Sequence, residues 1–307
     1  DSTSIHSIDF SLKKTYEKKF INKDDINYLI NDTEQIIKNF NKDKEILHII
    51  KSKIFFDNKI CEKLEFDKQN VNEVIIELKF IMIDKFNFDY VKNLLLEKHI
   101  SLKNIYCASY VKSLELIERL NINEYSSFID IGLKKSCLVV FNENKLLYIN
   151  NIHIGGHHIT KDISKVLNID YRKAEAEKIK FSKKNKISNH KKKEDDLLKN
   201  IINSRLEEII ELLFLNCPLL KNDHLKKDLK LYFIGNGSKA LNKNLLSLGA
   251  EFNFINEMSI IDEKWQDCCD SAIKFDAKID KIQPKKTNKG IENRGFFEKL
   301  FDYFNQK

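Results

Sequence analysis

Three short motifs in this chain could do chemistry, and each places glycine or small residues directly after an apolar run. Glycine is tolerated poorly inside regular elements and is favoured where backbone turns sharply or approaches a ligand. The chain has only eight glycines in 307 residues and none before Gly132. Their concentration in a few turns therefore indicates sites built from backbone. The motifs are Asp130-Ile131-Gly132, Gly155-Gly156 followed by Ile159-Thr160, and Gly235-Asn236-Gly237-Ser238.

Each motif suits an anion or a cation for a different reason. Asp130 could hold a hydrated divalent cation, and the backbone N–H groups of the turn that follows it could face a phosphate. Gly155-Gly156 precedes a predicted helix, whose first N–H groups and positive dipole end favour an anion. The turn at Gly235 follows a buried strand, where nucleotides bind in open α/β sheets. Taken alone, the first motif is more typical of an ordinary hairpin, the second fits a capped turn as well as an anion site, and the third is weak evidence for a nucleotide. Three such motifs in one chain together indicate a nucleotide site.

No other set of residues predicts catalysis or a metal. His153, His157 and His158 lack the helical spacing of a zinc pair, which favours solvent or packing roles. The six cysteines form no CxxC pair, so we predict reduced thiols, and Cys268-Cys269 is expected to pack in a helix. No Ser/His/Asp order or carboxylate pair is present. We therefore predict no catalytic residues, no metal ligands and no enzyme activity.

Composition narrows the class of protein. The length predicts two domains or one large bilobed one, and the 42% apolar content is enough for a core. A net charge of +7 could suggest nucleic acid. However, lysine, asparagine and isoleucine dominate while arginine is rare, which is typical of AT-rich coding, so we predict no nucleic-acid partner. No secretory signal and no apolar run of membrane-spanning length is present.

The elements that position these motifs follow from periodicity. Residues 1–84 predict a small mixed unit with a capped helix, and the alternation after residue 85 predicts an α/β layer with parallel strands. Predicted strands are Ser4–Phe10, Glu45–Phe56, Val71–Ile83, Asn104–Ala108, Ser126–Ile131, Cys137–Phe141, Lys145–Asn150, Lys230–Ile234 and Phe252–Phe254. Predicted helices are Asp24–Phe40, Tyr90–Lys98, Tyr110–Leu120, Ile159–Leu167, Asp170–Lys180, Leu197–Leu215 and Asp267–Asp276, with another helix after Gly235–Ser238.

The end of the chain predicts a linker at residues 277–293 and an amphipathic helix at residues 294–307. Such a helix could dock on the core or lie in a membrane interface. Lys285, Lys286, Lys289 and Arg294 just before the stripe favour the membrane. The apolar stripe consists of Phe296, Phe297, Leu300, Phe301 and Phe304.

In this order the motifs resemble the FtsA family of actin-like, ATP-binding cell-division proteins. FIDIG is similar to its second phosphate motif, IGGHHITKDIS to its GG-x-x-IT-x-DI segment and AEAEKIK to its AE-x-x-K contact. YFIGNGSKAL is similar to its adenosine motif and RGFFEKLFDYF to its membrane-targeting helix. ILHII, around His48, is similar to a strand of its subdomain 1C.

The resemblance implies an actin-like (ribonuclease H-like) α/β fold. Residues 1–84 would be subdomain 1C, and residues 85–276 domain 2, with subdomain 2B around residues 183–230. It implies ATP with Mg²⁺ as ligand. We expect subdomain 1A to be largely missing, because no Asp-x-Gly hairpin precedes Gly132, and one wall of the cleft with it. Leu133-Lys134-Lys135 replaces the family's Gly-Gly-Thr. The implied nucleotide contacts are Asp130, Gly132, Gly155, Gly156, Glu177, Lys180, Gly235, Gly237 and Ser238.

The resemblance also implies a function. It is that of a scaffold that polymerises, binds the C-terminal tail of FtsZ with Arg205 as a candidate contact, and works with other divisome proteins. It would tether FtsZ to anionic lipids at the cytoplasmic face of the inner membrane. Two alternatives stay open, a sugar-kinase-like phosphotransferase and the pilus-assembly actin-like scaffold. The first requires a catalytic Asp that is not visible here, and the second generally lacks an amphipathic tail.

Overall fold

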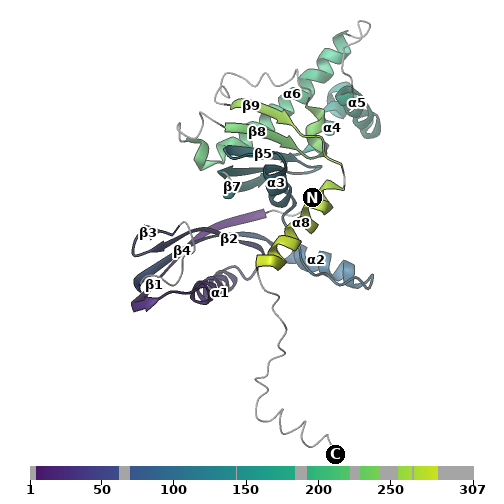
Figure 1. Ribbon diagram of the computed structural model, residues 1–307. Coiled ribbons are helices and arrows are strands. Elements are labelled where there is room, and N and C mark those ends of the chain that lie inside the picture. Colours follow the sequence, from purple (N-terminus) through teal and green to yellow (C-terminus); the bar gives the residue numbers. More distant parts are fainter. Residues whose placement is uncertain are drawn as a thin grey trace, which may run out of the picture.

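The computed structural model describes residues 5–61, 70–142, 144–183, 192–221, 229–241, 255–264 and 266–282. Two β-sheets, one above the other in Figure 1, carry the helices on their faces. The predicted strand Phe252–Phe254, the apolar stripe at residues 296–304 and most of the predicted linker lie outside the described residues.

The first sheet has four antiparallel strands in the order β1-β4-β2-β3. Helix α1 (Lys23–Phe40) lies on one face. The Asn22 side chain accepts the Asp25 N–H at 2.9 Å, and Asp25 accepts the Asn22 N–H at 3.0 Å. These reciprocal bonds satisfy donors that a helix start leaves open, so the predicted helix start is confirmed. The strands are β1 (Ile5–Phe20), β2 (Lys44–Phe56), β3 (Lys59–Ile60) and β4 (Asn70–Asp84).

Strand β4 contributes side chains to two apolar clusters, one on each face of the first sheet, because successive side chains of a strand point to opposite faces. Phe80 and Met82 belong to the apolar cluster beneath α1. Ile81, between them, belongs instead to the cluster that includes the second sheet. The wholly apolar end of this strand is therefore buried on both faces, as its sequence predicted.

The second sheet has five strands in the order β7-β6-β5-β8-β9. The first three form antiparallel hairpins, whereas β5, β8 and β9 are parallel. The carboxyl ends of β5 and β8 therefore lie side by side, which brings Gly132 and Gly235 to one edge of the sheet. The strands are β5 (Tyr125–Ile131), β6 (Ser136–Asn142), β7 (Lys145–Ile152), β8 (Leu229–Ile234) and β9 (Ile255–Ile260).

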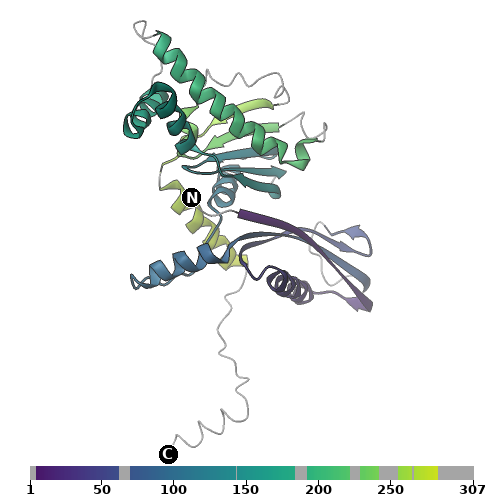
Figure 2. The same cartoon turned by 180° about the vertical axis from the view of Figure 1, so that it is seen from behind.

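Helices cover both faces of the second sheet (Figures 1 and 2). Ile129 packs toward one group of helices, and its neighbour Phe128 packs toward the other. The first group is α4 (Gly156–Leu167), α5 (Tyr171–Lys183) and α6 (Lys192–Leu215), and the second is α3 (Ala108–Arg119) and α8 (Asp267–Ile282). Helix α2 (Lys85–Leu96) has no buried residue. No helix in the described part of the chain is long and apolar enough to cross a bilayer.

Several predicted elements differ from the structure. Strand β1 continues to Phe20, well beyond the predicted end at Phe10, and α2 begins at Lys85 rather than Tyr90. The predicted strand Asn104–Ala108 does not form, because residues 104–107 are irregular and Ala108 begins α3. The Cys107 N–H donates to the His48 ring and not to a neighbouring strand. Asn104 and Tyr106 both donate to Asp276 on α8, at 2.8 and 2.5 Å. The predicted linker begins too early, because α8 continues to Ile282. The predicted helix after Gly235 is a 3₁₀ turn, η2 (Asn236–Ala240), and a second 3₁₀ turn, η1 (Pro218–Lys221), follows α6.

Candidate functional site

The three glycine motifs meet at the carboxyl edge of the second sheet. Gly132 directly follows β5, Gly155 is the N-cap of α4, Gly156 is its first residue, and Gly237 lies in η2. The Gly156 N–H donates to the Gly132 carbonyl at 2.9 Å. A β-carbon on Gly156 would lie 3.6 Å from both the Gly132 oxygen and the Gly237 Cα. Motifs that are up to about a hundred residues apart therefore form one glycine cluster, as a phosphate site requires.

Backbone packs so closely in this cluster that three positions, Gly155, Gly235 and Gly237, accept only glycine. A β-carbon on Gly155 would lie 2.6 Å from the Gly132 oxygen, far inside van der Waals contact. Gly235 has a φ of +85°, and its β-carbon would lie 2.7 Å from the Ile131 oxygen. Ser238 is buried and donates to the Gly235 carbonyl at 2.6 Å. The turn after β8 is therefore held by its own groups.

The first N–H groups of α4 are already used. Gly156 and His157 donate to the carbonyls of Gly132 and Leu133, at 2.9 and 2.7 Å, and the Gly155 N–H donates to His158 Nδ1 at 3.1 Å. A helix start binds an anion through N–H groups that lack a partner. The hairpin at Leu133 thus occupies the donors that the sequence suggested for phosphate.

A buried lysine lies beside the glycine cluster, and sequence reasoning missed it. Lys178 Nζ donates to the Gly156 carbonyl at 3.0 Å, to Thr160 Oγ1 at 2.7 Å and to Glu175 Oε2 at 2.8 Å. Thr160 also donates to Glu175. Burial alone would raise the pKa of the Glu175 carboxyl, but the bonds from Lys178 and Thr160 outweigh it and lower that pKa. This network fixes α5 against the start of α4.

The segment AEAEKIK contains two overlapping AE-x-x-K patterns. Glu175 and Lys178 form the inner one. Glu177 and Lys180 form the outer one, a surface pair 2.6 Å apart whose side chains are 42% and 64% exposed. Lys178 lies four residues after the buried Ala174, so both residues lie on the same, inner side of α5. This spacing could have identified Lys178 from the sequence. The outer pair does not join the cluster, and its contact with a nucleotide stays a prediction.

Asp130 lies in a buried group of charges that includes a second missed lysine. Lys112 Nζ, on α3, lies 2.9 Å from Asp130 Oδ2 and 3.1 Å from Glu263 Oε2. Ser109 also donates to Asp130, and the Gly235 N–H donates to Glu263. Burial alone would lower the pKa of the Lys112 ammonium, but the two carboxylates outweigh it and raise that pKa.

These contacts test whether the site suits the Mg²⁺ that the resemblance implies. A hydrated cation needs several free oxygen ligands. One Asp130 oxygen is bound by Lys112 and Ser109, and the other packs against Gly235. Among the described residues, no group of three or more His, Cys, Asp or Glu could hold a metal. The residues around Asp130 therefore do not fit a divalent cation.

The remaining predicted groups have structural partners. Arg205, on α6, binds Asp162 on α4 at 2.6 Å and also contacts Glu208. His157 Nδ1 pairs with the Tyr171 hydroxyl at 2.6 Å. All six cysteines are free thiols, as predicted. The exposed bond of His157 agrees with the solvent or packing role predicted for it, and the ion pairs of Arg205 hold it between two helices.

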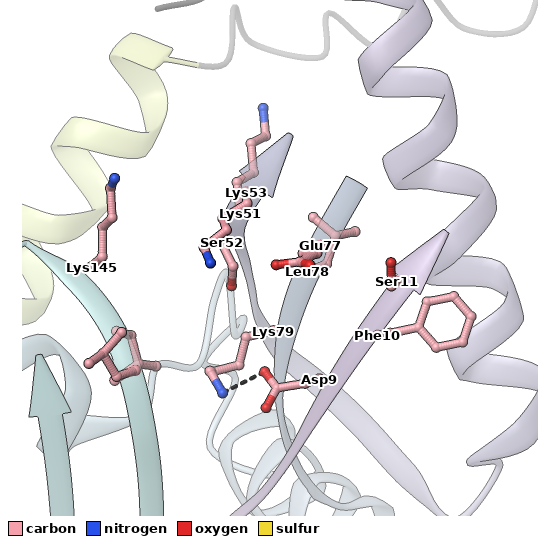
Figure 3. Close-up of a pocket in the computed structure, with 12 residues that line it drawn as sticks. Asp9, Phe10, Ser11, Lys51, Ser52, Lys53, Glu77, Leu78, Lys79 and Lys145 are labelled. Atoms are coloured by element: carbon pink, nitrogen blue, oxygen red, sulfur yellow. Dashed lines mark ion pairs between the residues drawn. The ribbon is translucent and has the colours of Figure 1, made fainter. Parts of the chain in front are cut away.

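A separate cavity of about 400 Å³ lies between the first sheet and β7 (Figure 3). Asp9 and buried Lys79 form an ion pair of 2.5 Å within it. Lysines outnumber carboxylates along its walls, so anionic groups suit it better than cationic ones. Its charged lining residues are Asp9, Lys51, Lys53, Glu77, Lys79 and Lys145.

Comparison with solved structures shows the fold. The chain superposes on a protein of the "PilM-PilN type IV pilus biogenesis complex" with a TM-score of 0.57 and 14% identity, covering 83% of this chain and 66% of that one. MreB 5 of Spiroplasma citri bound to AMPPNP gives a TM-score of 0.48 at 17% identity, covering 64% and 66%. The fold is actin-like, as predicted.

Part of the chain is similar in sequence to the FtsA family. Residues 127–261, from β5 to β9, match the family model "Cell division protein FtsA". Cell division protein FtsA of Helicobacter pylori strain 26695 is 24% identical over 147 residues, which is 45% of this chain and 28% of the relative. The protein from strain J99 gives the same values. The chain thus matches 28% of the length of these curated relatives.

Proposed function

We propose that this chain is part of a scaffold that tethers FtsZ filaments to the cytoplasmic face of the bacterial inner membrane at the division site. The match of residues 127–261 to the FtsA model carries this proposal. The scaffold would self-associate, recruit other divisome proteins and act without enzymatic turnover. Its family ligand is ATP with Mg²⁺. Glu177 and Lys180 are the polar groups of the predicted set that remain exposed to solvent, whereas the Asp130 carboxylate is paired with Lys112.

The C-terminal segment supplies the proposed membrane anchor. Changing Phe297 and Phe301 to Glu together should reduce sedimentation with anionic liposomes roughly tenfold or more, because two aromatic side chains leave the interface. K299E is the matched control, since replacing a positive by a negative charge changes the net charge by the same amount as the two Phe-to-Glu changes, but the residue lies on the polar face. Equal losses in both proteins would mean that the effect is electrostatic, and unchanged binding in the double variant would remove the anchor from the proposal.

The FtsZ tail contact is proposed for Arg205. R205A should weaken binding of a fluorescent FtsZ tail peptide about 10-fold or more, because a charge-assisted hydrogen bond contributes ~1.5–3 kcal/mol. Fluorescence anisotropy measures the affinity. D162N removes the negative charge that pairs with Arg205 across the two helices but keeps the guanidinium, so it should leave the affinity within about threefold. Parallel losses in R205A and D162N would show that Arg205 acts only by holding α4 against α6.

The pilus-assembly scaffold is the second candidate function. The likeness to the PilM–PilN complex supports the shared fold alone. The two measurements above separate the candidates, because a pilus scaffold would bind neither the FtsZ tail nor, through residues 294–307, a liposome. No described group favours the phosphotransferase alternative.

A further inference from the structure

Lys112 lies where three elements converge. It extends from α3 to Asp130 on β5 and to Glu263, which follows β9. The three side chains are only 9%, 12% and 11% exposed. Glu263 in turn accepts the Gly235 N–H at 2.9 Å. One ammonium group therefore links both parallel strands of the glycine cluster to the helix on the other face of the sheet.

The charge balance of this group requires a cation. Two buried carboxylates that share one site repel each other, and desolvation further disfavours their charged forms. A positive group at hydrogen-bond distance from both removes that cost. Divalent cations often perform this role in proteins, but here a side chain of the chain itself stands between the two oxygens.

We propose that the Lys112 ammonium is a built-in counter-ion that takes the place of a divalent cation at Asp130. The turns after β5 and β8 are then ordered by the chain's own charge, whether or not Mg²⁺ is available. The counter-ion role of Lys112 does not depend on the proposed partners, because it is tested on the isolated chain. A protein that failed to bind FtsZ or liposomes could still have this counter-ion.

The first test measures the unmodified chain with Mg²⁺, Mn²⁺ or EDTA. The melting temperature should move by less than about 1 °C, and calorimetric titration with Mn²⁺ should show no binding that depends on Asp130. Wild-type stabilisation by either metal that disappears in D130N would overturn the proposal.

The second test removes the ammonium group. K112S leaves Asp130 and Glu263 facing each other, so its melting temperature should fall, and millimolar Mn²⁺ or Mg²⁺ should restore roughly 3 °C or more. K274S is the matched control, because Lys274 pairs with Glu115 at 2.9 Å on the surface, and it should not respond to metal. A K112S protein that folds and ignores both metals would also overturn the proposal.

A third variant decides the case if K112S does not fold under any condition. In K112M/D130N/E263Q the site keeps its shape but carries no charge, so no counter-ion is needed. The triple variant should fold with and without metal. If it also failed to fold, Lys112 would be acting through packing rather than as a counter-ion, and the proposal would be wrong.

Discussion

Replacing Gly155 with alanine should destabilise the chain by about 3 kcal/mol or more and lower its melting temperature by roughly 6 °C or more. Its β-carbon would lie 2.6 Å from the Gly132 oxygen and 2.9 Å from both the Leu133 oxygen and the Lys135 nitrogen. All three are backbone atoms of a hydrogen-bonded hairpin, so none can move alone. Circular dichroism during thermal unfolding measures the effect.

Gly156 provides the matched control one residue away. A β-carbon there would have its nearest neighbours at 3.6, 3.6 and 3.7 Å, which is ordinary van der Waals contact. Alanine also favours the helical state over glycine by about 1 kcal/mol. G156A should therefore melt within about 2 °C of wild type, or slightly above it. Similar losses in both variants would contradict the close packing of the glycine cluster.

Much of the fold could be predicted because its signals are local. The capping pair Asn22 and Asp25 fixed the start of α1, and the wholly apolar end of β4 indicated burial on both faces. The irregular segment at Asn104 could not be read in this way. Its partner Asp276 is 172 residues away in the chain, and periodicity carries no information about such a contact. The resemblance supplied the actin-like fold, which no single element implied.

The sequence predicted the glycines that form the cluster, but it did not predict the buried lysines beside them. Scarce glycines in strand-flanked turns indicated that Gly132, Gly155 and Gly235 would meet. Lys112 was missed because a lysine in a helix normally indicates a solvent-exposed face. A signal was present, since Lys112 lies one turn from buried Ser109 and Leu116 on the same side of α3. A lysine on an inner face predicts a buried carboxylate, but the sequence does not show which one.

The joint between the two sheets should be sensitive to acid through His48. Its Nε2 accepts the Cys107 N–H at 2.8 Å, and Tyr106, Tyr110 and Phe275 surround the ring. Burial lowers the pKa of His48 from 6.5 to about 3. Below pH 6.5 the unfolded chain therefore gains a proton that the folded chain does not. Stability from this residue is complete above that pH and is lost at ~1.4 kcal/mol per unit as the pH falls toward 3.

The H48Q variant separates the contribution of His48 to the pH dependence of stability from that of the carboxylates, which also take up protons in acid. A glutamine carbonyl can still accept the Cys107 N–H but takes up no proton in this range. Urea unfolding at a series of pH values should show wild type losing about 2–3 kcal/mol more than H48Q over the two units below pH 6.5. H99N, at an exposed position, should follow wild type. Parallel curves for wild type and H48Q would mean that His48 is protonated in the folded chain. A steeper wild-type curve would instead show that neutral His48 stabilises the fold where β2 meets the start of α3, because the folded chain keeps the Cys107 N–H bond only with an unprotonated Nε2.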